Sequence, residues 1–177
     1  MRYPFRYDQK TAVEALLYIA ERLDDPTLHR VFKVMYFADK KHLEQYGRLI
    51  FGDCYIAMKK GPVPSRIYTL AKIVRGDFDD EYGAGVANTR KDFVIENGHH
   101  VVAKRPADLR QLSDSEREVL DWAIREYSEL SFDDLVARSQ NASYEAADED
   151  DVISVEALTI GVSDRDALLE HLGDPHP

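Results

Sequence analysis

The sequence lacks several features that would assign a protein to a class at once. Cys54 is the single cysteine among 177 residues, which excludes an internal disulfide and a zinc site built from cysteines. No apolar run approaches the roughly 18 residues of a membrane span, and residues 1–10 have no apolar segment typical of a signal peptide. We therefore predict one globular cytoplasmic domain over residues 1–173, with a disordered tail at 174–177.

Motifs of common enzymes are also missing. The sequence has no G-x-S-x-G, H-E-x-x-H or S-x-x-K pattern and no phosphate-binding glycine loop. The nearest approach, Gly83-Ala84-Gly85, lacks the third glycine of a dinucleotide-binding loop. The sequence thus predicts a protein that is not an enzyme and has no cofactor.

The net charge is negative and is unevenly distributed along the sequence. The net charge is −10, yet residues 1–75 carry about +6 and residues 76–177 about −16. Such asymmetry can mark a surface that attracts a charged partner, or the two halves can pack together with their charges simply solvated. A nucleic-acid binder usually has a net positive charge and a reading element, and neither is present. This speaks against direct nucleic-acid binding, although a regulatory protein that contacts nucleic acid through its basic first half is one alternative.

The most apolar stretch predicts a buried central helix over residues 26–46. Apolar residues recur at helical spacing, and the helix is apolar on most sides in its middle, which is typical of a helix surrounded by others. Asp25 and Pro26 are suitable for its start, and Gly47 for its end.

Short extended segments are predicted on either side of a further helix at 65–75. Residues 53–59 have the composition of a strand, whereas Pro62 and Pro64 argue against regular structure in 61–64. Asn97-Gly98 predicts a hairpin between 92–96 and 100–104, which the 53–59 strand is expected to join. With helices at 8–22, 113–127 and 164–172, and a short helix capped by residues 131–134 that contains Leu135 and Val136, the sequence predicts an α+β, mainly α fold.

The central stretch resembles a known family, the Panacea antitoxin or SocA-like domain. The resemblance rests on an ordered set of residues: Lys33 to Asp39, His42, Tyr46-Gly47-Arg48, Ile50-Phe51-Gly52-Asp53, Tyr55, Ala57, Gly61-Pro62-Val63 and Tyr68. It implies an antitoxin, often carried by phages and mobile elements, that neutralises a small toxin encoded nearby. Some members also act as adaptors that pass the toxin to a AAA+ protease.

The expected partner-binding residues lie on this stretch, since Tyr and Arg are frequent interface anchors. They are Tyr36, Asp39, Lys40, His42, Tyr46, Arg48, Lys59, Gly61, Pro62, Val63, Pro64 and Tyr68. For Tyr36 and Tyr55 a place in the core, with the hydroxyl hydrogen-bonded, is an equally good interpretation.

Two further points stay open at the level of sequence. Asp39, His42 and Asp53 could together bind a divalent cation in a metal-dependent enzyme, although their spacing is not that of a typical metal site. Family members carry a His and a Trp in a late segment where this chain has residues 139–144, including Gln140 and Tyr144. If that segment contacts the partner, the departure implies a different toxin or none, and it leaves the fold prediction unchanged.

Overall fold

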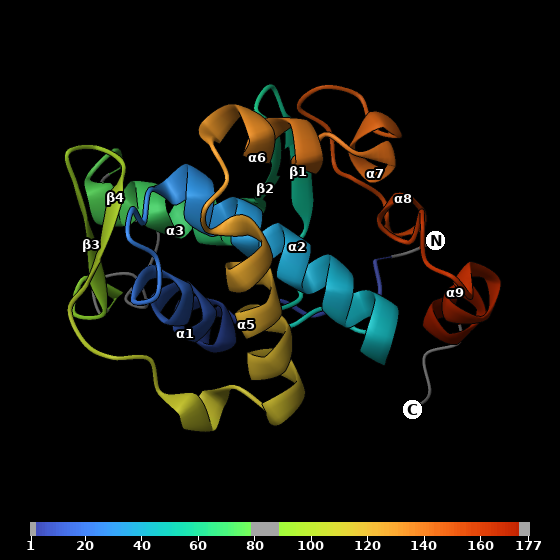
Figure 1. Cartoon of the computed structure of the whole chain (residues 1–177), viewed down its shortest axis with the longest axis horizontal. Coiled ribbons are helices and arrows are strands. Elements are labelled where there is room, and N and C mark those ends of the chain that lie inside the picture. Colours follow the sequence, from blue (N-terminus) through green and yellow to red (C-terminus); the bar gives the residue numbers. More distant parts are fainter. Residues whose placement is uncertain (1–2, 79–88, 174–177) are drawn as a thin grey trace.

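The computed structural model describes residues 3–78 and 89–173, and these fold around one long helix. Figure 1 shows this helix, α2, passing through the middle of the molecule. The elements are α1 (Gln9–Ala20), α2 (Leu28–Tyr46), β1 (Tyr55–Met58), β2 (Gly61–Pro64), α3 (Ser65–Arg75), β3 (Phe93–Glu96), β4 (His100–Ala103), a 3₁₀ turn η2 (Leu109–Gln111), α5 (Asp114–Tyr127), α6 (Phe132–Ser139), α7 (Ala142–Glu145), α8 (Val155–Leu158) and α9 (Arg165–Gly173).

Helix α2 is the core helix that the sequence predicts. It packs against α1, α5, α6 and β2, and its residues from Val31 to Asp39 are all buried. Thr27 caps it by accepting a hydrogen bond from the Arg30 amide, so the helix begins two residues later than predicted. Gly47 ends it in the left-handed conformation, as expected.

The α+β, mainly α class is confirmed, but the strands pair differently from the prediction. They form two separate antiparallel hairpins, β1–β2 and β3–β4, and not one sheet of three strands. The segment 61–64, which we expected to be irregular, is strand β2, with Ile56 opposite Val63 and Ala57 opposite Pro62.

The prolines of β2 are compatible with a strand because they stand at alternate positions. In an antiparallel pair, only every second residue directs its N–H toward the partner strand. Ala57, opposite Pro62, uses its own backbone groups on its other side, with Asp151 O and Asp150 N. Pro62 and Pro64 therefore occupy positions where no ladder hydrogen bond is lost.

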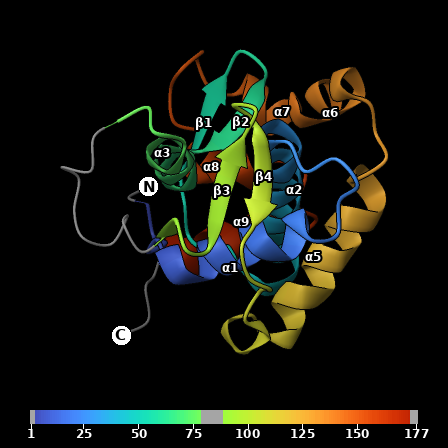
Figure 2. The same ribbon diagram turned by 90° about the vertical axis from the view of Figure 1, so that its left-hand side faces the viewer.

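The β3–β4 hairpin confirms the prediction made from Asn97-Gly98. Both turn residues have positive φ, at 50° and 77°. Figure 2 shows the hairpin above α1, beside α3.

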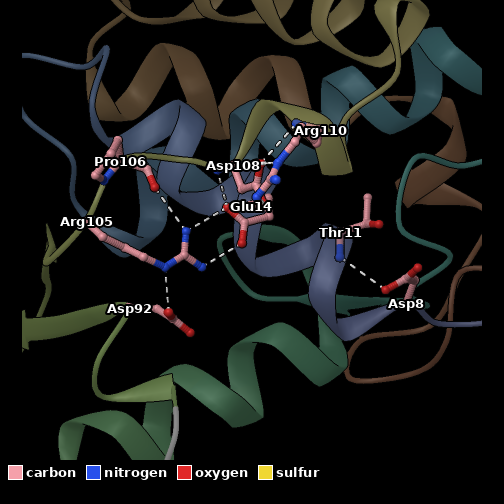
Figure 3. A network of polar contacts seen from close by, with 8 residues as sticks. All are labelled: Asp8, Thr11, Glu14, Asp92, Arg105, Pro106, Asp108 and Arg110. Carbon is pink, nitrogen blue, oxygen red and sulfur yellow. Dashed lines mark hydrogen bonds and ion pairs between the residues drawn. The ribbon is translucent and has the colours of Figure 1, made fainter.

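Arg105, just after β4, ties this hairpin to α1 (Figure 3). Its two terminal nitrogens donate to the Glu14 carboxylate at 2.9 and 2.6 Å, and its Nε donates to Asp92 at 2.7 Å. The Asp108 amide also donates to Glu14, so that this buried carboxylate is fully paired.

The second half of the chain adds short helices around α2. Ser113 and Glu116 form a capping box at the start of α5, which was predicted at 113–127, whereas α8 was not predicted. Residues 79–88 and the whole predicted tail at 174–177 lie outside the described residues. No helix in the described ranges is both long enough and apolar enough to cross a membrane.

Gly52 gives a direct test of how the N-terminal segment is seated. It has a φ of +67°, and a Cβ there would lie 2.2 Å from the backbone oxygen of Arg6. We expect Gly52→Ala to lower the free energy of unfolding by about 1–2 kcal/mol from the left-handed conformation and by a further ~1–3 kcal/mol from overpacking. Urea unfolding measures this loss.

Gly98→Ala is the matched control. Gly98 also has a positive φ, +77°, but nothing lies within 4 Å of the added Cβ. This variant is expected to lose only the conformational part. Equal losses in the two variants would show that the N-terminal segment is not packed on Gly52.

Candidate functional site

Half of the predicted partner-binding residues lie in the interior. Their side chains support the fold and do not meet the surface. They are Tyr36, Asp39, His42, Gly61, Pro62 and Pro64.

Asp39 joins α2 to the segment that follows it. Its carboxylate accepts hydrogen bonds from the Ile50 amide at 2.7 Å and from the Tyr55 hydroxyl at 2.7 Å, and it is fully buried. Burial raises its pKa to about 7, against the effect of these two hydrogen bonds. Asp39 therefore positions the start of β1 relative to α2.

Lys33 performs the same task one turn and a half earlier on α2. Its buried ammonium donates to the carbonyl oxygen of Pro62 at 2.8 Å, and desolvation lowers its pKa to about 7. Gly61 allows this approach, because a Cβ there would lie 2.3 Å from Ser139 Oγ and 3.1 Å from Lys33 Nζ. Lys33 thus holds the proline-containing corner of β2.

Asp53 and His42 are likewise occupied by hydrogen bonds within the chain. Asp53 accepts from the amides of Cys54, Arg66 and Ile67, and so caps α3 from a distance. His42 Nδ1 lies 2.8 Å from Arg48 O, which makes Nδ1 the donor and leaves Nε2 to accept from Ser115.

These contacts bear on the metal-site alternative. The oxygens and nitrogens that would hold a cation are engaged with the protein itself. Residues 3–78 and 89–173 contain no group of three His, Cys, Asp or Glu side chains placed to hold a metal ion.

The remaining predicted residues reach the surface at two separate ends of α2. Tyr46 and Arg48 are exposed at its C-terminal end, where Arg48 pairs with Glu116 at 2.8 Å. Lys40 is half-buried, nearly two turns earlier than Tyr46 on the same helix. Lys59, Val63 and Tyr68 lie at the other end, around the β1–β2 turn, and only these three line a common groove.

This groove, which we call the turn groove, is about 320 Å³ in volume. It is formed by the start of α2, the β1–β2 turn, α3 and the β3–β4 turn. Its lining residues are Leu28, His29, Phe32, Met58, Lys59, Lys60, Val63, Tyr68, Arg75 and His99. None of them is acidic, although the whole chain has a net charge of −10. The turn groove is thus locally cationic.

Aromatic rings extend the floor of the turn groove on both sides. Phe132 lies against His29, with ring centroids 4.2 Å apart, and Phe32 meets the Tyr68 ring edge-on at 5.7 Å. Phe132 and Phe78 are large apolar side chains left 45% and 44% exposed.

Lysines stand over this aromatic floor. Lys60 Nζ lies 5.8 Å from the Phe132 ring, and Lys72 Nζ lies between Tyr68 and Phe78, 4.6 and 5.3 Å from their rings. The arrangement combines apolar contact area with positive charge, which suits an interface anchored by aromatic and acidic groups.

His29 contributes an unsatisfied polar atom to the turn groove. Its Nε2 is buried and has no hydrogen-bond partner among the described residues. Desolvation, followed by the charge of Lys33, lowers its pKa to about 4, so the ring is neutral at physiological pH. A buried polar atom without a partner costs about 1–3 kcal/mol, and because this atom is closed off from the surface, a partner in the groove could reach it only after the ring turns.

Two residues of the segment 139–144, which differs from the family pattern, support the turn groove. The sequence did not indicate that they lie there. Gln140 Nε2 donates to Lys59 O at 3.1 Å, and the Tyr144 hydroxyl donates to Met58 O at 3.1 Å. The signal was present, since this segment differs from the family pattern, but its contact with the β1–β2 turn depends on tertiary structure.

The buried ionisable groups of α2 predict an unusual dependence of stability on pH. The pKa of Asp39 is 3.8 in the unfolded chain and about 7 in the folded protein. Between these pH values the folded state binds more protons than the unfolded state, so stability falls as pH rises. The pKa of Lys33 is 10.5 in the unfolded chain and about 7 in the folded protein. Between pH 7 and 10.5 the unfolded state binds more protons, so stability rises with pH. Their joint contribution is lowest near pH 7. Urea unfolding at about pH 5, 7 and 9 measures it.

Variants separate the two contributions. Asp39→Asn is expected to flatten the acid side of the profile and Lys33→Met the alkaline side, whatever their effect on stability at a single pH. Glu118→Gln, an exposed change on α5, serves as control. Unchanged slopes in the two α2 variants would contradict the assignment.

Comparison with known proteins adds one match. The family model described as "Antitoxin SocA-like, Panacea domain" matches residues 31–144. Comparisons with curated proteins and with solved structures give no match. The matched range includes every residue of the turn groove except Leu28 and His29.

Proposed function

Because the chain belongs to the antitoxin SocA-like Panacea domain family, we propose that it neutralises a cognate toxin protein by binding it in the turn groove. The family match supports the antitoxin role. One observation supports the turn groove as the binding site. Aromatic side chains and lysines meet at this surface, and no carboxylate is among the lining residues.

The chemistry of the groove indicates what part of the toxin it takes. Phe32, Val63 and Tyr68 offer an apolar floor, and Lys59 and Lys60 stand at the turn that forms its rim. An apolar anchor flanked by Asp or Glu complements both features, since charge complementarity speeds encounter and apolar burial slows dissociation. We therefore propose an acidic segment with an aromatic or aliphatic anchor as the bound element.

An adaptor role is an extension of the same proposal. A toxin bound in the turn groove would leave Tyr46 and Arg48, at the other end of α2, available to a AAA+ protease. Such a role requires that the toxin be degraded faster in the presence of this protein, whereas simple neutralisation leaves its lifetime unchanged or longer.

The neighbouring genes supply the test of toxin binding. Each is expressed with and without this protein, and we expect one product to arrest growth alone and to co-purify with this chain. Lys59→Glu combined with Lys60→Glu is expected to weaken the complex at least about tenfold, because like charges would then face the acidic segment. Phe132→Ser is expected to weaken it by removing an exposed apolar contact.

Two controls locate the effect. Lys104→Glu makes a similar charge change at the far end of β4 from the groove residue His99 and should leave binding unchanged. Tyr46→Ala probes the opposite end of α2. If Tyr46→Ala abolishes binding and the groove variants do not, the binding site lies at the C-terminal end of α2. The absence of any toxic or co-purifying neighbour would contradict the antitoxin role itself.

A further inference from the structure

A second pocket lies along the C-terminal half of α2, away from the turn groove. It is about 370 Å³ in volume, within the range typical of small-molecule sites. Figure 1 shows the elements that enclose it, with α5 and the α6–α7 junction on one side and the turn after α8 on the other. Its lining residues are Phe37, Lys40, Lys41, Glu44, Trp122, Tyr127, Arg138, Asn141, Ile160, Gly161 and Val162.

Three cations line this pocket against one carboxylate. Glu44 pairs with Lys41 at 3.0 Å, which leaves Lys40 and Arg138. Lys40 Nζ donates to Ser143 Oγ and to Ile160 O, both uncharged, and desolvation lowers its pKa to about 8. Arg138 makes no hydrogen bond or ion pair with another residue in the described part of the chain. Among the described residues, no carboxylate forms an ion pair with Lys40 or Arg138, although the charge of Glu44 acts on Lys40 from a greater distance.

The pocket also has an aromatic wall. Tyr127 stacks on Phe37 with the rings 3.8 Å apart and 7° from parallel, and Trp122 meets Tyr127 edge-on at 5.8 Å. Lys41 Nζ stands 5.5 Å from the Trp122 ring centroid. A flat heterocycle can stack on such a wall, as bases do on aromatic side chains in nucleic-acid-binding proteins.

Asn141 adds an oriented donor. Its Oδ1 accepts from the Tyr36 hydroxyl and from the amides of Ser143 and Tyr144, at 3.1, 3.1 and 3.4 Å. Because backbone amides can only donate, the side-chain amide is fixed with oxygen toward them. Its Nδ2 has no partner among the described residues and is available to an oxygen atom of a molecule in the pocket.

We propose that this pocket binds a nucleoside phosphate. The base stacks on the Trp122 wall, the phosphate lies between Lys40 and Arg138, and Asn141 Nδ2 donates to a base or sugar oxygen. A simple anion would leave the aromatic wall unused, and a neutral aromatic compound would leave two cations unpaired. The proposal concerns a surface distinct from the turn groove and does not depend on the toxin.

The experiment uses the purified full chain and its single tryptophan, Trp122, as a reporter. AMP, ATP and GTP are titrated while tryptophan fluorescence is followed, and calorimetry gives the affinity independently. We expect saturable quenching by at least one nucleotide. Adenosine and inorganic pyrophosphate, each of which satisfies only one half of the site, should bind at least about tenfold more weakly.

Arg138→Gln tests the phosphate contact in a side chain whose exposure makes misfolding no concern. It should weaken nucleotide binding about tenfold, the loss of one charge-assisted contact, and should leave adenosine binding unchanged. Arg125→Gln, an exposed change on α5 outside the pocket, should alter neither.

Three outcomes overturn the proposal. No heat or quenching with any nucleotide at millimolar concentration excludes the site. Pyrophosphate binding as tight as ATP binding shows an anion site without base recognition. Nucleotide binding that Arg138→Gln leaves unaltered places the ligand elsewhere on the protein.

Discussion

A polar group removed from water is costly unless it finds a hydrogen-bond partner, and three polar side chains of α2 find such partners in the segment that follows the helix. Lys33, Asp39 and His42 are each almost completely buried. Each is paired with a backbone atom of the segment that follows the helix, namely Pro62 O, Ile50 N and Arg48 O. Because an unpaired buried group costs about 1–3 kcal/mol or more, the chain from 48 to 62 is fixed in place against the helix. The turn groove exists because this segment is held there.

The sequence predicts the fold well where local signals are strong. The central helix, its end at Gly47, the Asn97-Gly98 hairpin and the helix at 113–127 all follow from residue type and spacing. The β1–β2 hairpin was missed because Pro62 and Pro64 were interpreted as breaking regular structure. Their spacing of two is in fact compatible with an edge strand, since both fall where the N–H points away from the neighbouring strand. What the sequence did not indicate was that the predicted 53–59 strand pairs with residues 61–64.

The candidate site was only partly predictable, for a different reason. The hydroxyl of Tyr36 and the carboxylate of Asp39 are groups that are also common on protein surfaces. Only tertiary packing decides whether these two side chains face water or the core. Lys59 and Tyr68 were predicted as contacts and do line the turn groove. His29 and Phe132 were not predicted, because their approach to 4.2 Å joins residues far apart in the chain. Gln140 and Tyr144 stood out as a departure from the family pattern, without any indication of what they contact.

The charge distribution also takes on a definite meaning in three dimensions. Most of the ion pairs among the described residues join sequence neighbours or involve a buried carboxylate, as between Arg105 and Glu14. These pairs leave other cations without acidic partners. Lys59 and Lys60 form no ion pair with a described residue. Among the described residues, the acidic second half reaches one cation of the turn groove, since Arg75 pairs with Asp77, and it leaves Lys59 and Lys60 unpaired. Over distances beyond about 8–10 Å salt screens what remains. Net charge argues against a nucleic-acid partner, but in the proposed complex the toxin meets the local charge at the groove, and that charge favours an acidic segment.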